Sequence, residues 1–289
     1  MRTMAGAVLL LACSACGVAY EQRTVSFDDR HGELGKMDVF SPKNVAKPAP
    51  GVLVLHGGSW TRGSKGDLDQ QAQMLAAEGY VVANANYRLS PDTQFPGAVQ
   101  DAWCALAWMR AHAAELKLSS EKVAVFGYSA GANLGDLVGL GAAQAGDCPN
   151  GQTSPVQAVI SGDGPADMRT LPGLGAKEIS DYLGGTPEQI PATYDASSPL
   201  KQVRSGAPPF LLIHGNTDLY VDVSQSYELR DALKGVGADA ELLIIDGDAH
   251  TVNPSADLGD NDNVQYTVDS PEAWAVMRDF LGRTVGAPR

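Results

Sequence analysis

The sequence has little positive charge and no long hydrophobic run. Its 289 residues include 21 lysines and arginines against 34 aspartates and glutamates, a formal net charge of −13. Nucleic-acid binding needs a basic surface patch, and no cluster of lysine or arginine is present to form one, so a nucleic-acid partner is not expected. No apolar stretch reaches the roughly 18 residues that a membrane-spanning helix needs. The 44% hydrophobic content is nevertheless ample for a globular core.

Cysteine is scarce, and two of the four cysteines stand near the N-terminus. Residues 1–3 carry one positive charge, 4–12 are almost wholly apolar, and small residues and cysteines follow. This layout predicts a signal peptide over residues 1–17, of the lipoprotein type, with Cys13 or Cys16 as the acylated residue. Ordinary cleavage near residue 16 is the open alternative. Either route exports the protein to the cell envelope or beyond, and a lipid on the N-terminus would be its only membrane attachment.

The other two cysteines, Cys104 and Cys148, would be the only ones left in the exported chain. An even pair in an oxidising compartment is a disulfide candidate. Two buried free thiols remain the alternative. Neither cysteine has a histidine nearby in sequence in an arrangement that would suggest catalysis.

Apolar runs and helical patterns alternate along the chain. Two β-rich segments, 22–27 and 36–40, predict a hairpin. The continuous apolar runs typical of strands buried on both faces are 51–55, 80–85, 123–126, 156–160, 210–213 and 240–245. Helical patterns lie at 67–78, 97–114, 132–143, 224–234 and 271–281. This alternation predicts an α/β fold, a mostly parallel eight-stranded sheet with helices on both faces. We expect one domain over 18–289, with a small insertion at about 162–209.

The pentapeptide 127–131 reads Gly-Tyr-Ser-Ala-Gly and lies between a predicted strand and a predicted helix. A G-x-S-x-G motif in that context is a nucleophile elbow, a sharp turn that presents its serine at the carboxyl end of the sheet. The flanking glycines are needed because the turn brings backbone segments close together. Ser129 is therefore the candidate nucleophile.

A second glycine-rich turn, His-Gly-Gly-Ser-Trp at 56–60, directly follows the strand predicted at 51–55. Its glycines let the backbone approach a ligand and turn N–H groups toward it. Together with the N–H of the residue after the nucleophile, such donors form an oxyanion hole. We predict that Gly58, Ser59 and Ala130 supply them.

A nucleophilic serine needs a base, and position selects one of the five histidines. His250 follows the last predicted strand and precedes an irregular loop, which could hold an imidazole over the serine. The acid that orients it should follow the preceding strand, where Asp218 stands. Asp222 and Asp246 are less suitably placed, the first beyond the turn and the second still within the last strand. The order Ser129, Asp218, His250 is that of nucleophile, acid and base in one particular fold.

With these motifs the sequence resembles the α/β-hydrolase fold carboxylesterases, in particular the bacterial feruloyl/acetyl-xylan esterase-like and hormone-sensitive-lipase-like enzymes. The resemblance runs from about residue 51 to 281. It rests on the motifs at 56–60, 87–91, 95–96, 101, 127–131, 182–187 and 214–218. It implies ester hydrolysis without a cofactor and a structural Arg88–Asp101 ion pair. Two departures stand out: Ser59 replaces a third glycine, and Tyr128 replaces an aspartate frequent in lipase-like relatives, which favours the feruloyl/acetyl-xylan side.

We therefore expect an exported serine carboxylesterase that acts on short-acyl esters, either small molecules or esters linked to polysaccharide. Trp60 and Tyr128 are candidate substrate contacts, although a core or rim position for Trp60 is an equal alternative. No metal site is predicted, because the acidic stretch 257–263 does not fit the calcium-loop spacing. An exopeptidase and a non-catalytic binding protein on the same fold are the less favoured alternatives.

Overall fold

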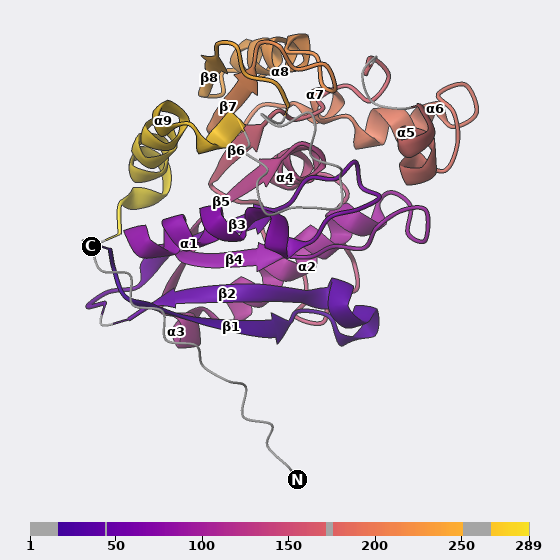
Figure 1. The fold of residues 1–289 in the computed structure, drawn as a ribbon. Helices are drawn as coiled ribbons and strands as arrows, with labels where there is room; N and C mark the ends of the chain where they lie inside the picture. Colours follow the sequence, from indigo (N-terminus) through magenta and orange to yellow (C-terminus); the bar gives the residue numbers. More distant parts are fainter. Residues whose placement is uncertain (1–16, 44, 172–175, 251–266, 289) are drawn as a thin grey trace.

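The computed structural model describes residues 17–43, 45–171, 176–250 and 267–288. One eight-stranded sheet forms the centre of this part of the chain. Its strands are β1 (Tyr20–Ser26), β2 (Lys36–Pro42), β3 (Ala49–Leu55), β4 (Val81–Ala85), β5 (Leu118–Tyr128), β6 (Ala158–Gly162), β7 (Phe210–Gly215) and β8 (Ala240–Ile245). Figure 1 shows the sheet from β1 at the bottom of the view to β8 at the top.

The strand order is β1-β2-β4-β3-β5-β6-β7-β8. The pairs β1–β2 and β2–β4 are antiparallel, and every pair from β4 to β8 is parallel. Because parallel strands end at the same edge, the turns that follow β3, β5, β6, β7 and β8 meet there. The fold class predicted from the sequence is confirmed, and that edge is where the site must lie.

Helices cover both faces of the sheet and divide the core into two clusters. On one face pack α2 (Gly97–Ala111), α4 (Ala130–Gly139) and α8 (Ser224–Gly235), and on the other α1 (Asp69–Glu78) and α9 (Pro271–Leu281). Strand residues alternate between the clusters: Leu53 belongs to the first, whereas Val52 and Val54 belong to the second. Both sides of each central strand are thus apolar, which is why these strands read as continuous hydrophobic runs.

The insertion at 162–209 contains the short helices α5 (Ala176–Leu183), α6 (Pro191–Ser197) and α7 (Pro199–Gln202). Tyr182 and Tyr194 from this segment are buried in the core cluster of α2 and α4. The insertion therefore packs on the main core, at the right of Figure 1.

Several boundaries differ from the sequence prediction. The expected helix 97–114 is divided at His112, and α3 (Ala113–Leu116) follows as a separate turn. The expected hairpin turn is a 3-10 segment, Asp29–Gly35. Helix α4 begins at Ala130, two positions earlier than expected. The earlier start matters for function because it puts the helix directly behind Ser129.

A disulfide joins Cys104 on α2 to Cys148 beyond α4, so the bonded alternative is the one the structure contains. Cys13 and Cys16, the loop residues 251–266 and the acidic stretch 257–263 within them lie outside the described residues. Within the described ranges, no helix combines the length and the hydrophobicity that crossing a bilayer requires.

Candidate active site

Ser129 stands at a strained turn between β5 and α4. Its backbone adopts φ 54° and ψ −118°, a region that residues with a side chain rarely occupy. The glycines at 127 and 131 permit this turn. A Cβ on Gly127 would lie 2.1 Å from the Gly131 carbonyl oxygen, and one on Gly131 would lie 2.1 Å from the Leu55 carbonyl oxygen. Any residue with a Cβ would clash with these backbone oxygens, so only glycine fits at 127 and 131. Close packing of the backbone thereby positions Ser129.

The histidine and aspartate predicted from the sequence lie in line with this serine. His250 Nε2 is 2.8 Å from Ser129 Oγ, and His250 Nδ1 is 2.6 Å from Asp218 Oδ2. Asp218 follows β7 and His250 follows β8, so neighbouring strand ends deliver them. The rival Asp246 lies just past β8 rather than within it, and accepts a hydrogen bond from the Asn216 side chain.

The Asp218 carboxylate is held by backbone and side-chain donors. Its Oδ1 accepts the N–H groups of Tyr220 and Val221 at 2.8 and 3.0 Å. Burial opposes ionisation, but the bonds from His214 and His250 prevail and hold the pKa of Asp218 well below its usual range. The aspartate is therefore an anion that can orient the His250 ring and stabilise a positive charge on it.

Beneath Asp218 lies a second, fully buried histidine. His214 Nε2 is 3.4 Å from Asp218 Oδ2 and 3.8 Å from Asp163 Oδ1. Burial disfavours its charged form, yet Asp218 and Asp163 together raise the pKa of His214 above its ordinary value. Ligand atoms of these three residues lie within 4.8 Å of one another. A cation would fit that spacing, but each carboxylate already accepts hydrogen bonds from N–H or O–H groups.

Tyr128 links the nucleophile turn to the base. Its hydroxyl lies within hydrogen-bond distance of two acceptors, Asp163 Oδ2 at 2.6 Å and the main-chain carbonyl of His250, which share its one proton. The side chain is only 1% exposed, and burial raises the pKa of its hydroxyl well above the ordinary value. The sequence motif suggested a substrate contact here. That role stays a prediction. In the structure Tyr128 supports His250 by bonding to its main-chain carbonyl.

The glycine turn after β3 lies against the nucleophile. A Cβ on Gly57 would be 3.3 Å from Ser129 Cβ, a proximity that the sequence prediction, centred on Gly58 and Ser59, did not include. The Gly57 carbonyl accepts the Tyr87 hydroxyl at 3.2 Å, and the Gly58 carbonyl accepts the Arg62 N–H at 3.1 Å. In a trans peptide the N–H points opposite to the preceding carbonyl, so the Gly58 and Ser59 N–H groups face away from these partners.

The third predicted donor, the Ala130 N–H, stands in the first turn of α4, where it has no acceptor within its own helix. These N–H groups can stabilise a negative oxygen next to Ser129. His56 anchors the turn from behind, because its Nδ1 lies 2.7 Å from the Gly57 carbonyl and its ring stacks on Tyr87 at 4.1 Å. Burial lowers the pKa of His56 to about 4, so it is neutral and is not a competing base.

Trp60 is completely buried, and its ring stacks on Tyr182 from α5 at a centroid distance of 4.5 Å. The structure thus gives Trp60 the core position that sequence reasoning had left open, and its substrate contact stays a prediction. The expected Arg88–Asp101 pair is present. The Arg88 backbone N–H donates to Asp101 Oδ2 at 2.7 Å, and the guanidinium Nη2 donates to Asp101 Oδ1, also at 2.7 Å.

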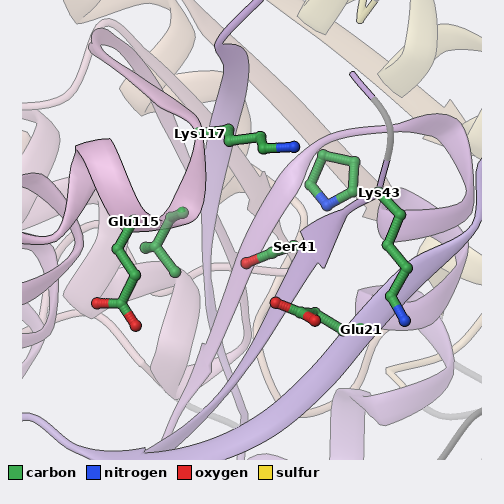
Figure 2. Close-up of a pocket in the computed structure, with 7 residues that line it drawn as sticks. Glu21, Ser41, Lys43, Glu115 and Lys117 are labelled. Carbon is green, nitrogen blue, oxygen red and sulfur yellow. The ribbon is translucent and has the colours of Figure 1, made fainter. Parts of the chain in front are cut away.

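A separate hollow of about 210 Å³ lies between the β1–β2 pair and α3. Figure 2 shows the side chains that line it, among them Glu21, Ser41, Lys43, Glu115 and Lys117. Lys117 immediately precedes β5 and Ser129 follows it, so the hollow lies at the opposite edge of the sheet. It holds no histidine or cysteine and is not part of the site around Ser129.

The chain is similar in sequence to proteins of one family. A family model described as BD-FAE matches residues 37–233. Esterase LipC of Mycobacterium tuberculosis is 31% identical over 225 residues, which cover 74% of this chain and 55% of the relative. The chain spans about half the length of the first curated relatives it matches.

Solved structures show the same fold. A truncated carbohydrate esterase from gut microbiota superimposes with a TM-score of 0.77 at 21% identity, covering 94% of this chain and 98% of that one. Thermogutta terrifontis esterase 2 phosphonylated by sarin also gives 0.77, at 23% identity and covering 92% and 96%. The fold is therefore that of the α/β-hydrolases, and since the family model spans most of the described sheet, the chain belongs to the BD-FAE family.

Proposed function

We propose that this protein is a serine carboxylesterase that hydrolyses short-acyl esters through an acyl-enzyme on Ser129. One observation carries the proposal: His250 Nε2 lies 2.8 Å from Ser129 Oγ while its other ring nitrogen lies 2.6 Å from Asp218. A serine hydroxyl is a poor nucleophile unless a base removes its proton, and this arrangement supplies that base.

In the first half of the reaction, His250 takes the proton of Ser129 as Oγ bonds to the ester carbonyl carbon. The carbonyl oxygen becomes an anion, for which the N–H groups of Gly58, Ser59 and Ala130 are the proposed donors. The bond to the alcohol oxygen then breaks, and His250 passes its proton to that oxygen. In the second half, water repeats these steps on the acyl-enzyme and releases the acid.

Two features support short acyl groups. The buried Trp60–Tyr182 stack fills space next to the glycine turn. Among the described residues, the large apolar side chains that are exposed lie outside α5, α6 and α7, whereas a lipase lid presents an apolar face. The described part of the insertion thus offers no exposed apolar surface to cover a long acyl chain.

Esters on polysaccharide are the second candidate substrates, as acetyl or feruloyl groups. The observation that favours them is the character of the structural neighbours, which include the gut-microbiota carbohydrate esterase and a protein described as a bifunctional GH43-CE from Bacteroides eggerthii. These neighbours share the fold, and they guide the choice of substrates to assay.

The test is hydrolysis of p-nitrophenyl esters from acetate to palmitate by the chain without residues 1–17. We expect a maximum at acetate or butyrate and, in Ser129→Ala, a fall in kcat of about 10⁶. Ser120→Ala, whose hydroxyl meets only Glu121 at 3.3 Å among the described residues, is the matched control and should keep full activity. Turnover retained in pure, folded Ser129→Ala would refute the mechanism.

We also propose that the protein is exported and acylated at its N-terminus. The Cys104–Cys148 disulfide supports an oxidising compartment. Palmitate labelling of bacteria that express the full chain should mark the protein, and Cys13→Ser or Cys16→Ser, whichever removes the lipid-bearing residue, should abolish the label. Recovery of unprocessed, unlabelled protein from the cytoplasm would contradict the proposal.

A further inference from the structure

His250 lies between two tyrosines of opposite character. The ring centroids of Tyr128 and Tyr220 are each 5.5 Å from that of His250. Tyr128 is buried and braces the histidine, but Tyr220 is 51% exposed. Leu219, next to it, is 84% exposed, the highest value among the large hydrophobic side chains of the described chain. The hydrolytic steps assign no role to this apolar pair.

The backbone at Tyr220 is hydrogen-bonded to the acid of the site. The backbone N–H of Tyr220 donates to Asp218 Oδ1 at 2.8 Å, and the next N–H, of Val221, donates to the same oxygen at 3.0 Å. The backbone that carries the tyrosine is therefore fixed to the acid of the site. A tyrosine has two side-chain torsions and loses little entropy when a ligand packs on it, so it is suited to binding by stacking.

The side of the site that Tyr220 faces follows from the reaction. The alcohol half of the ester must lie at His250, because that histidine gives its proton to the departing alcohol oxygen. We propose that Tyr220, flanked by Leu219, is the binding surface for the alcohol half and selects alcohols that carry a six-membered ring, whose face stacks on the tyrosine. The inference rests on the proposed function and extends it from the bond that is cleaved to the substrate that is chosen.

This role confines the effect of Tyr220 to one half-reaction. In acylation, Ser129 Oγ bonds to the acyl carbon, the bond to the alcohol oxygen breaks, and the ring-bearing alcohol takes the proton from His250. The alcohol has departed before water attacks. Tyr220 therefore contributes to acylation and not to deacylation, whereas a residue that merely supports His250 would affect both.

The experiment compares acetates that share an acyl group and a class of alcohol. Benzyl acetate is paired with propyl acetate, and a monoacetylated methyl xyloside with isopropyl acetate. In Tyr220→Ala we expect kcat/KM for the ring-bearing member of a pair to fall about three- to tenfold, the range typical of one lost ring contact, and the open-chain member to be unchanged. Tyr220→Phe, which keeps the ring, should resemble wild type. Tyr227→Ala removes another exposed tyrosine, one that lies over Arg230, and is the matched control.

Deacylation is read from the steady-state rate that follows the burst with p-nitrophenyl acetate, and it should be equal in wild type and Tyr220→Ala. Loss on the xyloside alone would identify sugars as the ring, and loss on benzyl acetate alone would identify aromatic alcohols. Equal losses for ring-bearing and open-chain esters, or a slower deacylation, would overturn the proposal. If wild type itself shows no Ser129-dependent turnover, the proposed function has failed instead.

Discussion

Two buried aspartates illustrate how differently the two halves of the site are built. Asp136, on α4 behind the nucleophile turn, accepts a hydrogen bond from Ser161 at 3.0 Å, and its Oδ1 has no partner in the described structure. Burial raises its pKa to about 8. Asp218, in the other half, accepts bonds from two histidines and two N–H groups, and its pKa is depressed.

The contrast shows what positions each catalytic group. Around Ser129, backbone contacts and apolar packing determine the geometry, and the buried carboxyl of Asp136 stays neutral at neutral pH. Around His250, a hydrogen-bond network centred on the charged Asp218 carboxylate determines the geometry. Damage to the packing that supports Ser129 should therefore appear as lost folding, and damage to the network around His250 as lost catalysis in a folded protein.

Gly131→Ala should have the largest effect. Its Cβ would meet the Leu55 and His56 carbonyl oxygens at 2.1 and 2.3 Å, and backbone atoms of a buried strand end cannot move aside. We expect loss of folded protein, a cost above about 4 kcal/mol. Gly235→Ala, in α8 with open space around its Cβ position, should be neutral or slightly stabilising. Thermal unfolding by circular dichroism checks both, and a Gly131→Ala protein with the wild-type Tm would contradict the packing argument.

Asp218→Asn should lower kcat by about 10⁴ while the protein stays folded, because the amide no longer holds the productive tautomer of His250. The matched control is Asp222→Asn. Asp222 also accepts a backbone N–H, that of Ser224 at 2.9 Å, and also has a lowered pKa, but it lies outside the Ser129–His250 hydrogen-bond line. Initial rates with p-nitrophenyl acetate distinguish the two. Comparable losses in both variants would mean that the turn, rather than the charge, matters.

Asp136→Asn tests the opposite pKa shift. The folded pKa of about 8 exceeds the usual aspartate value of 3.8. The contribution of Asp136 to wild-type stability is therefore full below about pH 4, is lost as the pH rises toward 8, and is constant above it. The variant lacks this loss. Its unfolding free energy relative to wild type should therefore grow from pH 4 to pH 9 by on the order of 2–4 kcal/mol. Urea titrations across that range measure it, and parallel curves for the two proteins would refute the shift.

Tyr128 connects the two halves of the site. Its substitution Tyr128→Phe should have the smallest effect of the four variants. The change removes the hydroxyl that lies between Asp163 and the His250 carbonyl. Because the His250 ring is then held less firmly in position, kcat should fall about tenfold with little change in KM. Tyr194→Phe deletes a hydroxyl that reaches the Gly185 carbonyl at 3.2 Å in the insertion, and should leave kcat unchanged. An unaltered kcat in Tyr128→Phe would show that the brace is dispensable.

Local sequence signals predicted the fold and the three residues of the hydrogen-bonded line. Parallel strands buried on both faces read as unbroken apolar runs, and the elbow needs glycine at 127 and 131 whatever surrounds it. The sheet order, in contrast, has no local signal. Asp163 and His214 lie 51 positions apart, and only the pairing of β6 with β7, which sets Gly162 against Ile213, brings them together under Asp218. No motif at Asp163 announces its bond to Tyr128.

The sequence also did not decide whether Trp60 lies in the core or lines the substrate pocket. Its stacking partner, Tyr182, comes from an insertion more than a hundred residues later in the chain. Such a contact depends on how the insertion folds back over α2 and α4. The same holds for Tyr220, whose position beside His250 follows from the end points of two separate strands.

The disulfide has a topological consequence. The ring that it closes, from Cys104 to Cys148, encloses all of β5, the Ser129 turn and α4. A protease that cuts inside this ring, for example at the exposed Lys122, leaves a single covalent molecule in which the nucleophile stays tethered on both sides. Nicked protein would therefore migrate as intact chain until it is reduced, and the catalytic serine is carried in the one part of the sheet that a single cleavage cannot release.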